Sequence, residues 1–224
     1  MGSGLWGMSA WDFIKAGGPL LIPILLCSFF ALGIFIEKIS YFASIKTDVV
    51  LLKKRVFDLI KNNQIIEAIK LCESDRSAVA KILKAGLLKF GSSREDIKES
   101  IEAVSLLEIP KLEIRLGALA TIAHISPLLG LLGTVAGMTS IFHTIQIRAA
   151  SLNPVTSGDL AGGIYEALLT TIAGLMVAIP AFIAYNYCIA RTNHIILEME
   201  RVATELVNLM HHISEANSGA QVIE

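Results

Sequence analysis

Residues 162–186, GGIYEALLTTIAGLMVAIPAFIAYN, predict a helix that crosses a membrane and carries one carboxylate, Glu166. No other side chain between residues 160 and 190 is charged. A charged side chain facing hydrocarbon costs about 3 kcal/mol on insertion scales, so such a residue usually faces a protein interior or a water-filled path. The segment therefore favours a protein that moves an ion.

The composition of the chain also indicates a membrane protein. Hydrophobic residues make up 54% and charged residues 17%, with a mean hydropathy of +0.63. These values lie far from those of an ordinary soluble domain. Three uncharged apolar runs, at residues 19–36, 116–147 and 167–190, are long enough to cross a hydrocarbon core. We expect an all-α integral membrane protein with three transmembrane helices, the second and third long and extending into a cytoplasmic helical bundle.

The positive charges predict how the chain crosses the membrane. Of the 19 Lys and Arg residues, 15 lie between Lys38 and Arg115, and two more follow the third span. Because cytoplasmic loops are enriched in Lys and Arg, the N-terminus is expected outside and the C-terminus in the cytoplasm. The expected segments are an external amphipathic segment (1–18), a first transmembrane helix (19–37), a cytoplasmic helical loop (38–115), a second transmembrane helix (116–147), an external loop (148–160), a third transmembrane helix (161–190) and a cytoplasmic C-terminal helix and tail (191–224).

The cytoplasmic loop is expected to be helical. Its patterns and breaks predict short amphipathic helices at residues 49–61, 64–73 and 77–90. A fourth start signal lies at residues 92–95, where a serine N-cap precedes acids. That helix is expected to run into the second span, with bends at Pro110 and Pro127.

The third helix is expected to begin near Thr156 and to continue past Arg191, with a disordered end at residues 217–224. Its cytoplasmic part carries an apolar seam with the alternating spacing of a helix that packs against other helices. Packing against this chain's own cytoplasmic helices and contact between subunits are both open. The seam consists of Ile195, Met199, Val202, Leu206, Leu209 and Ile213.

Small residues on the second and third spans predict close helix packing. Gly133 and Gly137 form a GxxxG pair, and Gly130 lies one turn earlier. Such residues let helix backbones approach closely in membranes. On the third span, Gly174 and Ala178 are expected to serve the same purpose.

Four polar side chains are the candidates for an ion pathway. Glu166 and Thr170 are four residues apart and share a helix face, whereas Thr171 is turned away from Glu166 by about 140°. Thr134 either bonds its own helix or lines a polar path. The alternative for Glu166 is a structural carboxyl that stays neutral by burial or pairs with another helix.

The sequence offers little for other chemistry. It contains no phosphate-binding glycine loop, no paired membrane carboxylates and no nucleophile elbow, so we predict that the protein is not an enzyme and needs no cofactor. His211 and His212 are adjacent on a helix and make poor metal ligands, so no metal site is expected. His124 and His143 in the second span are either satisfied polar groups or proton relays.

Two motifs resemble a known family. The sequence from Ser126 to Gly137 is SPLLGLLGTVAG, and residues 163–186 contain GIYEALLTTIAGLMVAIPAFIAYN. Together they are similar to the ExbB/TolQ branch of the MotA/TolQ/ExbB proton-channel family. The three-span layout extends this resemblance over nearly the whole chain, whereas the loop matches only in length and helical character.

The resemblance implies a homopentamer in a bacterial inner membrane. The second and third helices would surround the single helices of an ExbD/TolR-like partner dimer, and a TonB- or TolA-like protein would carry the work outward. Thr134 and Thr171 match the family's pore-facing threonines, and Glu166 matches its pore-facing glutamate. Thr170 stands where some relatives carry a small residue. The implied function is coupling of the proton-motive force to mechanical work on the cell envelope.

Other functions remain open. A four-span flagellar stator of the same family does not fit three spans, but a gliding or polysaccharide-export motor does. A non-conducting membrane scaffold, in which Glu166 and the threonines only join helices, is the rival from another class. The residues permit either H⁺ or Na⁺, whereas the resemblance favours H⁺.

Overall fold

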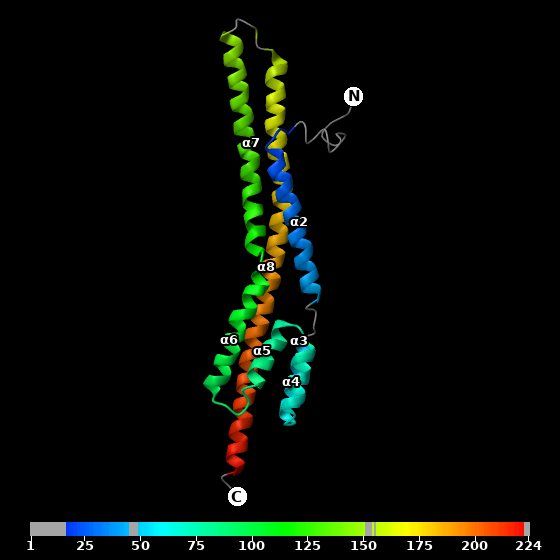
Figure 1. Cartoon of the computed structure of the whole chain (residues 1–224), viewed down its shortest axis with the longest axis vertical. Helices are drawn as coiled ribbons and strands as arrows, with labels where there is room; N and C mark the ends of the chain where they lie inside the picture. Colours follow the sequence, from blue (N-terminus) through cyan, green and yellow to red (C-terminus); the bar gives the residue numbers. More distant parts are fainter. Residues whose placement is uncertain (1–16, 45–48, 151–153, 155, 222–224) are drawn as a thin grey trace. The chain divides into compact units, whose positions relative to one another are not determined.

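A computed structural model of the chain describes residues 17–44, 49–150, 154 and 156–221. All regular elements of these residues are helices (Figure 1). The predicted amphipathic segment at residues 1–18 lies outside the described residues except for Gly17 and Gly18. The helices are α2 (Leu21–Ser44), α3 (Val49–Lys61), α4 (Ile65–Ser74), α5 (Ala78–Leu87), α6 (Arg94–Glu113), α7 (Leu116–Ala150) and α8 (Ser157–Gln221).

The chain divides into two compact units. The first, here called the membrane unit, comprises the described residues of Met1–Glu37 and Arg115–Tyr187. The second, the loop unit, comprises the described residues of Lys38–Ile114 and Cys188–Glu224. The membrane unit therefore holds most of α2, all of α7 and the first half of α8.

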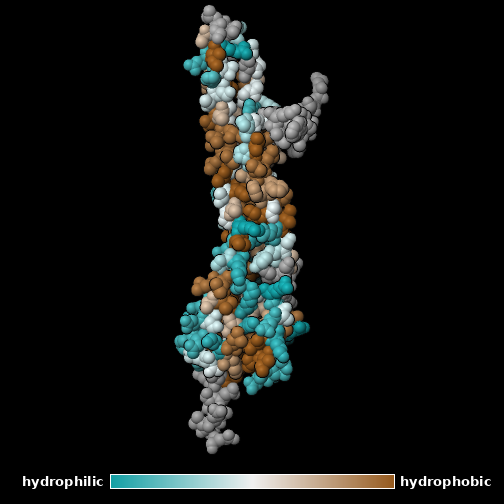
Figure 2. Space-filling model, in the orientation of Figure 1, coloured by the Kyte–Doolittle hydropathy of each residue, from teal (hydrophilic) through white to brown (hydrophobic). Residues whose placement is uncertain are grey.

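Three helices are long and apolar enough to cross a membrane, over Leu21–Ala43, Arg94–Ala150 and Leu160–Ile213. In the membrane unit large apolar side chains face outward, and Figure 2 shows hydrophobic residues gathered over its helices. Exposed apolar surface of this extent suits contact with lipid. The predicted fold class, with three membrane helices of which the second and third are long, is confirmed.

Small side chains bring the three membrane helices together. A buried cluster joins Ala31 of α2, Leu119 and Ala123 of α7, and Ala181 and Ala184 of α8. Lipid tails are as apolar as these side chains, so close van der Waals packing rather than burial from water holds such helices together. Alanine allows this contact because it keeps the helix backbones near one another.

The second long helix is interrupted at a position that no sequence pattern predicts. α6 continues through Pro110 and ends at Glu113, and α7 begins at Leu116. Between them Arg115 has a positive φ of 64°. In the membrane unit its guanidinium pairs with the Glu37 carboxylate. Helical hydrogen bonding is therefore interrupted at Ile114 and Arg115, whereas α6 and α7 continue through Pro110 and Pro127. The bends at the two prolines stay a prediction.

The loop unit has a hydrophobic core. Leu52 and Val56 of α3, Leu83 of α5, and Met199 and Leu206 of α8 are among its buried residues. The α8 seam predicted from the sequence faces this core: Met199, Val202 and Leu206 are buried, and Ile195, Leu209 and Ile213 pack against them. The seam thus packs against this chain's own helices, and its contact with other subunits stays a prediction.

Serine caps begin two of the loop helices, as the sequence predicts. Ser77 accepts a hydrogen bond from the Ala80 amide at the start of α5. Ser93 and Asp96 form a capping box at the start of α6. The C-terminus differs from expectation, because α8 continues as a helix to Gln221 through much of the predicted disordered end.

A buried carboxylate, Glu108, joins α5 and α6 in the loop unit. Its side chain is 8% exposed, and Nζ of Lys81 and of Lys111 lie 2.7 Å and 2.6 Å from its oxygens. Burial alone would raise the pKa of Glu108, but hydrogen bonds from Lys111 and Lys81 outweigh it and lower the pKa. The ionised form is therefore favoured in the folded state.

Glu108→Gln should lower the stability of the loop unit by about 1–2 kcal/mol, because both lysines lose a charged acceptor and are themselves partly exposed. The lowered pKa stabilises the fold above the ordinary pKa of a glutamate, and this contribution disappears as the pH falls through the native pKa. Hydrogen exchange of the α5 and α6 backbone amides, followed as a function of pH, measures the free energy of opening of these helices in both variants and wild type. The matched control is Glu102→Gln, which removes only an exposed ion pair with Lys98. It should change the free energy of opening measured by exchange by only a few tenths of a kcal/mol. Equal effects of both variants would contradict this prediction.

Candidate ion pathway

In the membrane unit, α7 and α8 approach closely along a line of small residues. A Cβ added at Gly130 would lie 3.0 Å from Cα of Thr171, and one at Gly137 would lie 2.9 Å from Cβ of Ala167. A Cβ at Gly133 would overlap the Thr170 side chain. The glycines predicted to pack helices therefore stand where the α8 backbone comes closest.

The same contact continues one turn further along α8. A Cβ added at Gly174 would lie 2.6 Å from the Ser126 carbonyl oxygen and 3.1 Å from Cα of Gly130. Ala178, one turn after Gly174, is buried. Ser126, the first residue of the SPLLGLLGTVAG motif, is fully buried, and its hydroxyl donates to the Ile122 carbonyl at 2.7 Å.

The three candidate threonines make different hydrogen bonds. Thr171 Oγ1 donates across the helix contact to the Gly130 carbonyl at 3.0 Å. Thr170 Oγ1 donates within α8 to the Ala167 carbonyl at 2.8 Å, and its side chain is buried. Thr134 Oγ1 donates within α7 to the Leu131 carbonyl at 2.7 Å. Of the three, Thr171 is therefore the one that links α7 to α8.

Glu166 is half-buried and lies beside the start of α2. A Cβ added at Gly18 would overlap the Glu166 carboxylate. Gly18 also has a φ of +65°, a conformation that residues with a side chain rarely adopt. The carboxylate thus occupies space that only glycine leaves open, near the helix end whose dipole favours a negative group. Sequence reasoning missed this contact, although Gly17 and Gly18 before the first span were its available signal.

The structure places the four polar candidates on α7 and α8 but does not gather them into one cluster. Thr170 is covered by Gly133, Thr171 bonds to α7, and Glu166 reaches toward Gly18. A path for ions through one isolated chain would have to pass between these positions. Additional copies of the helices, which would enclose a lumen, are a natural way to bring half-buried groups to a common surface.

His124 in the second span has a polar partner on its own helix. His124 Nδ1 lies 2.7 Å from the Ala120 carbonyl on its own helix, and its ring meets Phe182 edge-on. This is how a satisfied polar side chain behaves in a membrane helix. Within the described residues, no cluster of His, Cys, Asp or Glu could hold a metal ion.

The part of the chain that carries this site is similar to known membrane proteins. The model of the MotA/TolQ/ExbB proton channel family matches residues 74–201, which include all four polar candidates. The chain is 30% identical over 171 residues to putative biopolymer transport protein ExbB-like 3 of Synechocystis, covering 76% of this chain and 80% of the relative. It is 34% identical over 146 residues to the Tol-Pal system protein TolQ of Pseudomonas aeruginosa, covering 60% and 62%. It is 29% identical over 167 residues to biopolymer transport protein ExbB of Neisseria meningitidis serogroup B, covering 69% and 73%.

Proposed function

Because the chain belongs to the MotA/TolQ/ExbB proton channel family, we propose that it is the large subunit of a motor that couples proton flow to mechanical work on the cell envelope. Proteins of this family's ExbB and TolQ branch are channel subunits and not enzymes. The observation that carries the proposal is Glu166, the one charged residue between residues 160 and 190. An isolated carboxylate kept in a membrane helix is a functional group by default.

The proposed assembly is a pentamer with its pore lined by α7 and α8. Thr134, Thr171 and Glu166, with Thr170 nearby, would line the pore around a dimer of ExbD/TolR-like single-span partners. The half-buried state of Glu166 in one chain supports this role, because the carboxylate needs either water or a partner. In this assembly the partner supplies the carboxylate that takes up and releases the proton.

The energy available is sufficient for mechanical work. One charge that crosses 100 mV releases about 2.3 kcal/mol, so several protons in a cycle exceed thermal energy many times over. Five subunits around two inner helices cannot contact both inner helices identically. Passage of each proton would therefore favour a stepwise rotation, which a TonB- or TolA-like protein would carry outward.

The proposed orientation follows the positive charges. The loop between α2 and α7 and the end of α8 would lie in the cytoplasm, and the N-terminus outside the inner membrane. This places the loop unit on the cytoplasmic side. A membrane-impermeant thiol reagent applied to intact cells should leave a cysteine introduced for exposed Leu88 in the loop unit unlabelled and label it after lysis.

Stoichiometry tests the assembly directly. Native mass spectrometry of the detergent-extracted protein, expressed with an ExbD/TolR-like single-span protein of the same organism, should give five copies of this chain and two of the partner. A monomer or dimer that ignores the partner would remove the pore. Glu166 would then be a structural carboxyl held against Gly18.

A further inference from the structure

Two helices of the loop unit have exposed faces of opposite charge. α3 contains four basic residues and one acid, whereas α6 contains six acids and three basic residues. On α3, Leu52, Val56 and Ile60 face the core. Its outer face begins with the exposed apolar side chains Val50 and Leu51. It continues with the exposed bases Lys54, Arg55 and Lys61, among which lies one exposed acid, Asp58.

The outer face of α6 has the same two parts in reverse chain order. Leu106 and Leu107, near its end, are 74% and 66% exposed. Glu95, Glu99 and Glu102, toward its start, are exposed acids. Large apolar side chains so exposed on a unit with its own core mark a surface that contacts another protein or lipid.

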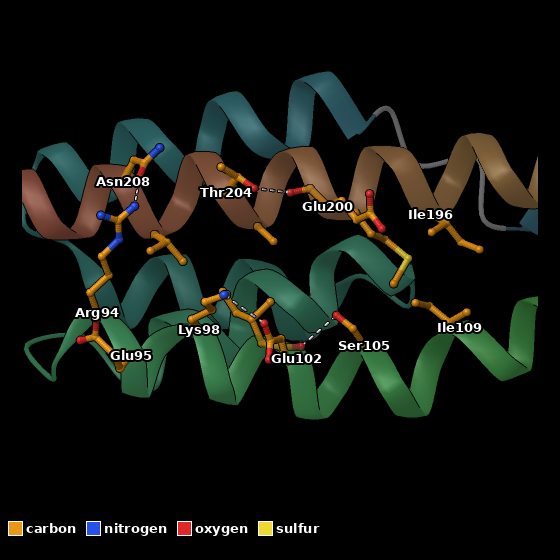
Figure 3. A pocket seen from close by; sticks show the side chains of 14 residues that line it. Arg94, Glu95, Lys98, Glu102, Ser105, Ile109, Ile196, Glu200, Thr204 and Asn208 are labelled. Atoms are coloured by element: carbon orange, nitrogen blue, oxygen red, sulfur yellow. Dashed lines mark hydrogen bonds and ion pairs between the residues drawn. The ribbon is translucent and has the colours of Figure 1, made fainter.

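A groove runs beside this acidic face. It has a volume of about 620 Å³ and lies between α6 and α8 (Figure 3). Its walls are apolar at one end and polar at the other. Ile109 of α6 and Ile196 of α8 lie at the apolar end. At the polar end the Arg94 guanidinium donates a hydrogen bond of 3.0 Å to the Asn208 side chain. Glu102 borders the groove, so the groove and the acidic face form one continuous surface.

The two faces lie at matching levels along α8. Val50 at the start of α3 lines a pocket with Ile195, and Ile109 near the end of α6 lies beside Ile196. Further along, Lys53 pairs with Glu205 at 2.5 Å. α3 and α6 therefore run in opposite directions along α8, with their apolar parts at one level and their charged parts at the next.

Matching levels matter in a ring. Rotation about an axis parallel to α8 moves a subunit around a ring without shifting its level along α8. A ring interface is heterologous, so it joins two different surfaces of the same subunit. Helices pack in the order α3, α4, α5, α6, and Figure 1 places α3 and α6 on opposite sides of α5. The two faces thus have the separation, level and charge that a ring contact requires.

We propose that the outer face of α3 docks onto the acidic face and groove of α6 in the next copy of this chain. The inference rests on the ring assembly proposed above and specifies its cytoplasmic contact. Within the described residues, Lys54, Arg55 and Lys61 form no ion pair in their own chain, and neither do Glu95 and Glu99. Contact with a neighbour pairs these charges and covers Val50 and Leu106.

Cross-linking tests the contact in the full complex in membranes. A chain carrying both Val50→Cys and Leu106→Cys should form, under mild oxidation, a ladder of covalent oligomers up to the pentamer. A disulfide requires Cα atoms within about 7 Å, so the ladder reports direct contact. The matched control is Ile66→Cys with Leu106→Cys, because Ile66 of α4 is as exposed as Val50, at 72%. An equal ladder from the control would overturn the proposal.

Charge reversal gives an independent readout. With Val50 against Leu106 and the two helices antiparallel, Lys54 lies opposite Glu102 of the next copy. Lys54→Glu or Glu102→Lys alone should therefore shift the equilibrium from pentamer toward smaller species about twofold per interface at low salt. The double variant should restore the wild-type distribution, since the pair is rebuilt with its signs exchanged. Additive losses in the double variant would overturn the contact.

The outcomes separate this inference from the proposed function. If native mass spectra show a pentamer but the Val50→Cys, Leu106→Cys chain forms no ladder, the proposed contact is contradicted and the proposed motor function is not. If the chain forms no pentamer, both the contact between α3 and α6 and the proposed function are contradicted. A ladder together with a pentamer supports both.

Discussion

Replacing Glu166 with glutamine should reduce proton flux through the assembled complex about 100-fold, the scale of removing one fixed group that stabilises charge where the proton is transferred, here beside the partner's carboxylate. Glutamine keeps the size and polarity of the side chain but carries no charge and cannot exchange a proton. The carboxylate is the one charge of its span, so the variant leaves that span without an ionisable side chain. Flux is measured in liposomes containing the complex, with an internal pH dye and an imposed potential.

Two controls separate conduction from assembly. Glu198→Gln changes a carboxylate on the same helix beyond the predicted span and should leave flux unchanged. Native mass spectra of Glu166→Gln should still show the full complex, because the neutral side chain fits beside Gly18. If Glu166→Gln, Thr134→Ala and Thr171→Ala all assembled and conducted like the wild type, the protein would be a scaffold.

The helices of both units could be predicted because their signals are local. An apolar run, the positions of Lys and Arg, and a serine before acids each act within a few residues. Val49–Lys61 and the Ser93 cap are where the sequence predicts them. The all-helical fold follows from such signals, since a membrane helix satisfies its own backbone hydrogen bonds.

The features that were missed depend on residues far apart in the chain. The interruption at Arg115 needs a positive φ in a residue that is not glycine, and no pattern in the sequence marks it. Lys38, the first residue of the expected cytoplasmic loop, is buried, and its Nζ donates to the Leu112 carbonyl at 2.8 Å. Gly18 meets Glu166 only once α2 and α8 have packed. Tertiary contact, not local preference, decides each of these positions.

In the candidate pathway, too, local features could be predicted and contacts between helices could not. Spacing along one helix gave the face shared by Glu166 and Thr170 and the different direction of Thr171. It could not give the partner of Thr171, because the Gly130 carbonyl belongs to another helix. A residue expected to line a pore therefore also joins the two helices on which that pore depends.

Gly174→Ala should destabilise the contact between α7 and α8 by about 1–3 kcal/mol. The added methyl group would lie 2.6 Å from the Ser126 carbonyl oxygen, and a backbone atom cannot rotate away as a side chain can. The helices must separate or shift, which also strains the hydrogen bond from Thr171 to Gly130. The variant should melt at a lower temperature in detergent and form less of the full complex.

Gly162→Ala is the matched control on the same helix, because a Cβ at Gly162 meets nothing within 4 Å. Alanine is the better helix former by about 1 kcal/mol, so this variant should be neutral or more stable. The two substitutions are chemically identical and should have opposite effects. If both melted alike, close packing of α7 on α8 would not limit stability. If Gly174→Ala alone lost assembly and flux, the spacing of these helices would be part of the conducting structure.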